Sequence, residues 1–112
     1  MKKIEALIRT SRFDVIHQGI AELGVKFMTF YEVKGMGLQH AKPQQYRGVV
    51  YEPTYIPRTK VEIVVTDEMA EPVIQCILKE GKTGDVGDGK IFVSEILAVY
   101  RIRNADTDED AL

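Results

Sequence analysis

The sequence predicts an α+β fold with the element order β-α-β-β-α-β, which is typical of ferredoxin-like sandwiches. Two stretches carry apolar residues at helical spacing, and each lies between runs of β-branched or alternating residues that favour strands. The length of 112 residues, 45% of them apolar, suits one domain that spans residues 1–112. We therefore expect both helices on one face of an antiparallel sheet, whose open face invites self-association.

The chain begins with a predicted strand followed by a helix. Residues 3–9 form the first apolar run, and Ser11 with Asp14 resembles a capping box that would start the helix. Helical spacing ends at Gly24. The residues that show this spacing are Phe13, Ile16, Ile20 and Leu23.

A second strand and a long connection come next. Residues 26–34 are aromatic and β-branched, and Gly35 is expected to end the strand. Residues 36–58 show little periodicity, and their prolines and tyrosines argue against a hidden helix and for a contact surface. A connection this long in a small domain is either functional or conceals a hairpin. From the residues alone, both interpretations stay open.

The second half repeats this plan. Residues 60–65 predict a strand, and a helix begins near Asp67, with Pro72 close enough to its start to be tolerated. The apolar stripe of this helix consists of Met69, Val73, Ile74, Ile77 and Leu78. Strand character returns over residues 90–103, and residues 104–112 form an acidic tail.

Charge and hydropathy exclude several classes of protein. The net charge is −2, and no strong basic cluster suggests a nucleic-acid surface. The single cysteine, Cys76, cannot form an internal disulfide, and its apolar helical surroundings favour a buried thiol in a cytoplasmic protein. No apolar run is long enough to span a membrane, so we expect neither membrane insertion nor a signal peptide.

The glycine loop, residues 82–90, is the main local signal of function. Glycine tolerates positive φ, so successive loop amides can converge on a phosphate while Lys90 adds a positive charge. Arg101 and Arg103, at i and i+2 of the predicted last strand, would point to one face, and together with the loop they look like half of a nucleotide site. The loop lacks the spacing of a P-loop, and Ile91 stands where a P-loop has a hydroxyl. An ordinary glycine-rich turn is the alternative.

Over its whole length the chain resembles the PII nitrogen-regulatory signalling proteins. The segments that carry this resemblance are residues 2–6, 21–24, 32–35, 46–48, 83–84 with 87–93, and 101–103. The last two are the most specific. The resemblance implies a non-catalytic homotrimer whose sheets enclose a central core and whose three clefts between subunits each bind ATP or ADP.

The resemblance also implies ligand-binding residues. Those that match nucleotide-binding positions are Thr29, Gly37, Leu38, Gln39, Val64, Gly87, Asp88, Gly89, Lys90, Arg101 and Arg103. Thr29 and Val64 would face the adenine. Bound beside Mg²⁺-ATP, 2-oxoglutarate would contact Gln39, Arg58 and Gly87, and Gln39 would also ligate Mg²⁺. Arg58 stands where the family has a lysine, and its fork can pair with a carboxylate.

By the same resemblance the long loop, residues 36–58, is the output element. Ligands at its base would bias its conformation through their differential affinity. Arg47 would enter the pore of an ammonium channel or contact a nitrogen-assimilation enzyme, and Tyr51 matches a tyrosine that is uridylylated in some members. Leu38, where many members have an arginine, and Ala41, where glycine is usual, depart from the family. The protein would be cytoplasmic, with recruitment to a membrane channel.

Other classes of function remain alternatives. The nearest is an energy-state sensor that distinguishes ATP from ADP without responding to 2-oxoglutarate. A small phosphotransferase of this fold would need a base near the glycine loop, but His17 and His40 have no carboxylate partner at a fixed spacing, so we do not expect an enzyme. An RNA-recognition module would need stacking aromatics in residues 59–66, which have none. A purely structural trimer would bind no nucleotide.

Overall fold

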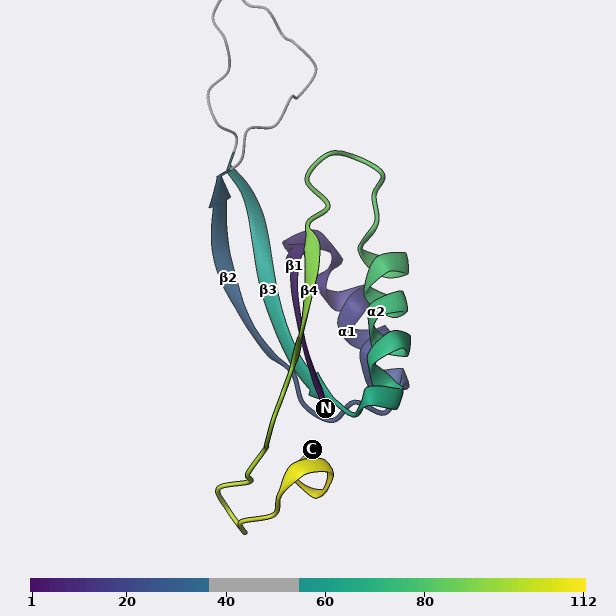
Figure 1. Ribbon diagram of the computed structural model, residues 1–112. Coiled ribbons are helices and arrows are strands. Elements are labelled where there is room, and N and C mark those ends of the chain that lie inside the picture. Colours follow the sequence, from purple (N-terminus) through teal and green to yellow (C-terminus); the bar gives the residue numbers. More distant parts are fainter. Residues whose placement is uncertain (37–54) are drawn as a thin grey trace, which may run out of the picture.

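The computed structural model describes residues 1–36 and 55–112. Within these residues four strands form one antiparallel sheet in the order β2-β3-β1-β4, and two helices cover one of its faces (Figure 1). The elements are β1 (Lys2–Arg9), α1 (Phe13–Glu22), β2 (Thr29–Met36), β3 (Tyr55–Val65), α2 (Asp67–Gly81) and β4 (Lys90–Glu95), with 3-10 turns at Thr10–Arg12 and Asp108–Ala111. The predicted α+β ferredoxin-like class is confirmed.

The core lies between the sheet and the two helices, because alternate residues of each strand face the helices. In the β1–β3 ladder Ile4 lies opposite Ile63, and Ala6 lies opposite Val61. The other buried core residues are Ile8, Ile16, Ile20, Val65, Ala70, Val73 and Ile77. Full burial of each large aliphatic side chain contributes about 1.5–3 kcal/mol, so this alternation decides which face of the sheet stays open.

The open face of the sheet carries a grid of charges at its centre. Lys3 Nζ lies 2.8 Å from Glu5 Oε1, and Lys60 Nζ lies 3.7 Å from Glu62 Oε1. Glu5 and Glu62 are cross-strand partners, so the two lysines offset a repulsion between two carboxylates. Hydrogen bonding to Lys3 lowers the pKa of Glu5. This face is therefore polar at its centre as well as uncovered.

Three boundaries in the first two thirds of the chain differ from the sequence prediction. The Ser11–Asp14 capping box is wrong, because Thr10–Arg12 is a 3-10 turn and α1 starts after it without a side-chain cap. The second strand begins at Thr29 and continues through Gly35. The third begins at Tyr55. Both ends of the predicted loop over residues 36–58 therefore belong to the β2–β3 ladder, which extends to the Met36–Tyr55 pair.

The last predicted strand, residues 90–103, is wrong beyond Glu95. Lys2 is the first residue of β1 and pairs with Glu95, so the chain beyond Glu95 has no neighbouring strand. A turn closes instead, in which the Arg101 N–H donates to the Asp106 carbonyl and the Ala105 N–H donates to the Arg101 carbonyl. In the described part of the chain no helix combines the length and apolar character needed to cross a bilayer.

Candidate functional site

The glycine loop joins α2 to β4 and follows a path that requires glycine. Gly84, Gly87 and Gly89 have φ values of 90°, 105° and 100°. A Cβ on Gly89 would lie 1.7 Å from the Leu7 carbonyl oxygen. The loop therefore crosses the end of β1 at a distance that no other residue type permits.

The Asp88 carboxylate organises this loop from within. Its Oδ2 accepts hydrogen bonds from the N–H groups of Thr83 and Gly84, both at 2.9 Å, and its Oδ1 accepts from the Thr83 hydroxyl and from Arg9 Nε at 3.0 Å. These hydrogen bonds hold the pKa of Asp88 far below its usual range. The bond from the Thr83 hydroxyl has the largest effect, and the two backbone donors and Arg9 add to it. Because this negatively charged carboxylate is hydrogen-bonded within the loop, only the backbone of Asp88 is available to bind an anion.

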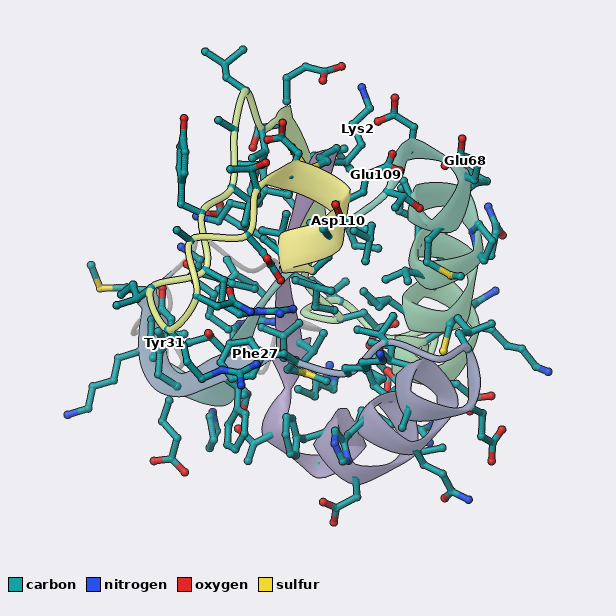
Figure 2. All side chains as sticks on the ribbon, turned by 90° about the horizontal axis from the view of Figure 1, so that it is seen from below. Lys2, Phe27, Tyr31, Glu68, Glu109 and Asp110 are labelled. Carbon is teal, nitrogen blue, oxygen red and sulfur yellow. The ribbon has the colours of Figure 1, made fainter. Side chains whose placement is uncertain are left out.

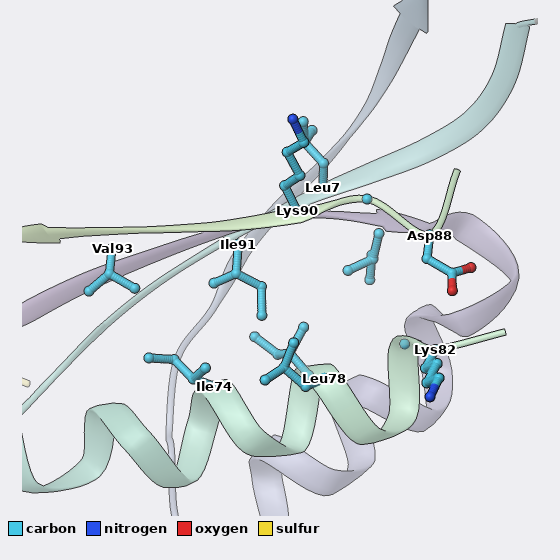
Figure 3. A pocket seen from close by; sticks show the side chains of 12 residues that line it. Leu7, Ile74, Leu78, Lys82, Asp88, Lys90, Ile91 and Val93 are labelled. Atoms are coloured by element: carbon cyan, nitrogen blue, oxygen red, sulfur yellow. The ribbon is translucent and has the colours of Figure 1, made fainter. Parts of the chain in front are cut away.

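Three arginines hold the loop from outside by its carbonyl groups. Arg12 Nη2 lies 3.4 Å from the Lys82 oxygen, Arg9 Nη2 lies 3.1 Å from the Val86 oxygen, and Arg58 Nη1 lies 2.6 Å from the Gly87 oxygen. Arg9 and Arg12 were not predicted from the sequence, since contacts from side chains to distant carbonyl groups follow no sequence spacing. Lys90, at the end of the loop, points to the side of the sheet away from α2 (Figure 3).

A pocket of about 510 Å³ lies below the loop, between β4 and α2. Ile74 and Leu78 of α2 face Ile91 and Val93 of β4 across it (Figure 3). Lys82, Asp88, Gly89 and Lys90 also line it. Its walls are apolar, and the polar groups belong to the glycine loop.

A second pocket, of about 840 Å³, brings together Thr29, Val64 and Arg101. Lys3 and Glu62 of the open face also line it, as do the C-terminal residues Ala111 and Leu112. Figure 2 looks onto this end of the molecule, where the terminal turn that bears Glu109 and Asp110 lies over the end of the sheet. The predicted adenine-facing residues therefore share a hollow with one of the two predicted phosphate-binding arginines.

Arg101 is held by the acidic tail. Its Nη1 donates to Asp106 Oδ2 at 3.0 Å, and its Nη2 donates to the Asp110 carbonyl at 3.1 Å. Arg103 is exposed in the turn that follows. The prediction that Arg101 and Arg103 share one strand face is wrong, because Asn104 forms a turn by accepting the Asp106 N–H on its side chain.

The predicted nucleotide residues therefore form two groups. Val64 lies opposite Lys3, whereas Lys90 lies opposite Leu7. These β1 positions are four residues apart, or about 13 Å at the usual rise per strand residue. The two pockets have no lining residue in common, so one chain does not bring its two groups together.

Several predicted residues lie outside the described ranges. These are Gly37, Leu38, Gln39, Arg47 and Tyr51. Among residues 1–36 and 55–112 no group of three His, Cys, Asp or Glu side chains is arranged to hold a metal ion.

Comparison with known proteins identifies close relatives. A family model described as nitrogen regulatory protein P-II matches residues 1–106. Two relatives are proteins named nitrogen regulatory protein P-II, from Pasteurella multocida (strain Pm70) and Rhizobium meliloti (strain 1021). They are 42% and 44% identical to this chain over 112 residues, and each alignment covers 100% of this chain and 100% of the relative. A solved structure titled "Structure of B. subtilis GlnK" superposes with a TM-score of 0.82 at 39% identity, covering 99% of this chain and 97% of that one.

Proposed function

The chain belongs to the P-II family of nitrogen regulatory proteins, and from this premise we propose that it is a non-catalytic signalling homotrimer. ATP or ADP binds in clefts between its subunits, and 2-oxoglutarate acts as the second input. The observation that carries the proposal is the division of the nucleotide residues into two groups at opposite ends of one sheet.

The division supports a site between subunits. A nucleotide needs both an adenine pocket and a phosphate-binding loop. Within one chain, a segment of β1 separates the pocket that contains Thr29 and Val64 from the position of Lys90. A neighbouring copy can supply the missing half, as in ring-shaped oligomers whose interfaces are heterologous. Each subunit then contributes one half to each of two clefts.

The 2-oxoglutarate site is supported by the position of Arg58. Its guanidinium already contacts Gly87, the other described residue assigned to this ligand. Arginine matches the planar carboxylate geometry. Gln39 would be the protein ligand of Mg²⁺, which would neutralise part of the charge of the nucleotide phosphates.

Segment 37–54 joins β2 to β3 and is proposed as the output element. Arg47 would contact an ammonium channel or a regulatory enzyme of nitrogen assimilation, and Tyr51 is the candidate modification site. The protein would act in the cytoplasm and be recruited to the membrane by that channel.

Mixing of variants tests the site between subunits. Arg101→Ala and Lys90→Ala each damage one half of every cleft, so each pure trimer should lose nucleotide affinity in isothermal titration. Trimers reassembled from both variants should regain full affinity in about a quarter of their clefts, as random assortment in a symmetric ring requires. If mixing restores no binding, the two residues do not act across an interface.

An energy-state sensor without a 2-oxoglutarate response is the second candidate. It is favoured by the short contact of 2.6 Å between Arg58 Nη1 and the Gly87 carbonyl, because this contact engages one of the nitrogens that a bidentate pair with the carboxylate would use. Titration with 2-oxoglutarate in the presence of Mg²⁺-ATP separates the candidates. Saturable binding supports the two-input sensor, and absence of binding alongside intact nucleotide affinity supports the energy-state sensor.

A further inference from the structure

Arg9 and Arg58 lie directly opposite each other at the end of the β1–β3 ladder. Side chains of cross-strand partners emerge on the same face, and like charges in this position oppose each other. The pair therefore requires acceptors nearby. The glycine loop provides them, because Arg9 donates to the Val86 carbonyl and Arg58 donates to the Gly87 carbonyl.

We propose that this arginine pair is a clamp that orients the phosphate-binding amides of the glycine loop. Neither arginine needs to touch the nucleotide for this role, so both act as positioning residues. The inference rests on the proposed function, since the ligand of the oriented amides is the phosphate chain of the nucleotide.

Peptide geometry gives the clamp its effect. The described peptide bonds are all trans, so the N–H and C=O of one peptide unit point in opposite directions. When the carbonyls of Val86 and Gly87 face the arginines, the N–H groups of Gly87 and Asp88 face away from them. Among the described residues neither N–H donates to a protein acceptor. Two adjacent free donors form the kind of concavity that binds anions.

Arg9 also fixes the loop through Asp88. Its Nε donates to Asp88 Oδ1 while its Nη2 reaches the Val86 carbonyl. The Asp88 carboxylate in turn holds the N–H groups of Thr83 and Gly84. One guanidinium thus links both ends of the loop to β1. It uses donors on two separate nitrogen atoms, whereas a lysine has only one nitrogen.

Arg58 links the loop to the β2–β3 hairpin. A Cβ on Gly35 of β2 would lie 3.5 Å from Arg58 Nε, and a Cβ on Gly89 would lie 3.5 Å from Arg58 Nη1. The side chain therefore runs through a gap that two glycines leave between the hairpin and the loop. Any shift of Gly87 on binding a phosphate is transmitted to β3 through this bond.

The clamp is tested with Arg9→Ala and Arg58→Ala, and with Arg12→Ala as the matched control. Arg12 holds the same loop at the Lys82 carbonyl, so its loss removes the same charge without freeing the Val86 or Gly87 peptides. In titrations with ADP and no 2-oxoglutarate, the first two variants should lose about tenfold in affinity, and the control should lose less than about threefold. Arg9→Lys should fail to restore affinity, because it keeps the charge and loses the fork.

Unchanged ADP affinity in Arg58→Ala, with loss of 2-oxoglutarate binding only, would overturn the clamp and leave Arg58 as a carboxylate receptor. Full rescue by Arg9→Lys would also overturn it, since charge alone would then suffice. Amide hydrogen exchange of the ligand-free protein gives a readout that does not depend on nucleotide. The Gly84 amide should exchange faster in Arg9→Ala than in Arg12→Ala.

These readouts separate the clamp from the proposed function. If the wild-type protein binds no nucleotide, the proposed function fails, and faster exchange of the Gly84 amide in Arg9→Ala still supports the clamp. If nucleotide binds and neither the exchange rates nor the affinity respond to Arg9→Ala, the clamp alone is refuted.

Discussion

Arg101 Nη1 donates to Asp106 Oδ2 at 3.0 Å, and this bond holds a proposed phosphate-binding cation on the protein's own C-terminal tail. The tail also places Ala111 and Leu112 in the pocket that contains Thr29 and Val64. A nucleotide phosphate that pairs with Arg101 Nη1 therefore competes with the Asp106 carboxylate for this nitrogen.

Asp106→Ala should raise the affinity for ADP, because it frees Arg101 from this competition. Partly exposed ion pairs are worth little, so a gain of about twofold to fivefold is expected. The control is Asp110→Ala, since Arg101 bonds only the backbone carbonyl of that residue and a comparable negative charge is lost. Titration of both variants at equal ionic strength measures the effect, and equal gains would show that general electrostatics is responsible.

Gly89→Ala should destabilise the protein more than Gly84→Ala. Both glycines have positive φ, which costs an L-residue about 1–2 kcal/mol, but only at Gly89 would the new Cβ meet backbone, 1.7 Å from the Leu7 oxygen. At Gly84 nothing lies within 4 Å. Urea denaturation at one protein concentration compares the two variants. Equal losses of unfolding free energy would mean that φ strain alone governs both sites.

The sequence was sufficient to predict those features that depend on local pattern. Burial at alternate positions of β1, and of Val73 and Ile77 in α2, follows directly from the apolar pattern, whereas Leu78 of the predicted α2 stripe is exposed. The loop glycines were recognised as residues that tolerate the positive φ found at Gly87 and Gly89. Boundaries set by a neighbouring strand were not predictable in this way. Tyr55 joins β3 because β2 extends to meet it, and β4 ends at Glu95 because β1 begins at Lys2.

The same distinction between local pattern and long-range contact applies to the candidate site. The loop glycines and Lys90 were identified from sequence, since their chemistry is visible in single residue types. The engagement of Arg101 by Asp106 was not identified, because it depends on a turn closed by Asn104. Nor was the contact of Arg9 with Asp88, which joins residues at opposite ends of the chain.

Gly19→Ala should destabilise the packing of α1 on α2. A Cβ on Gly19 would lie 2.6 Å from the Cys76 Sγ, so the half-buried thiol must move. Gly19→Ala/Cys76→Ala removes the clash, and the double variant should be more stable than the sum of the two single effects predicts. Thermal unfolding of all four proteins completes the double-mutant cycle. Strict additivity would mean that the thiol moves aside without cost.

Asp88 should make folding stability depend on pH. Its hydrogen bonds depress its pKa in the folded state, so the unfolded state binds more protons as the pH falls through the ordinary range of an aspartate, near 4. The contribution of Asp88 to stability is therefore complete above that range and is lost progressively below it. Asp88→Asn should lower the free energy of unfolding most near neutral pH and progressively less in acid.

Urea denaturation at a series of pH values measures this difference between Asp88→Asn and the wild type. Asp85→Asn is the control, because the Asp85 carboxylate accepts no hydrogen bond from the residues that the structure describes. Its effect should stay nearly constant over the same pH series. A difference for Asp88→Asn that is equally large at about pH 3 and about pH 7 would contradict the linkage, since the carboxylate would then not be the group that stabilises the loop.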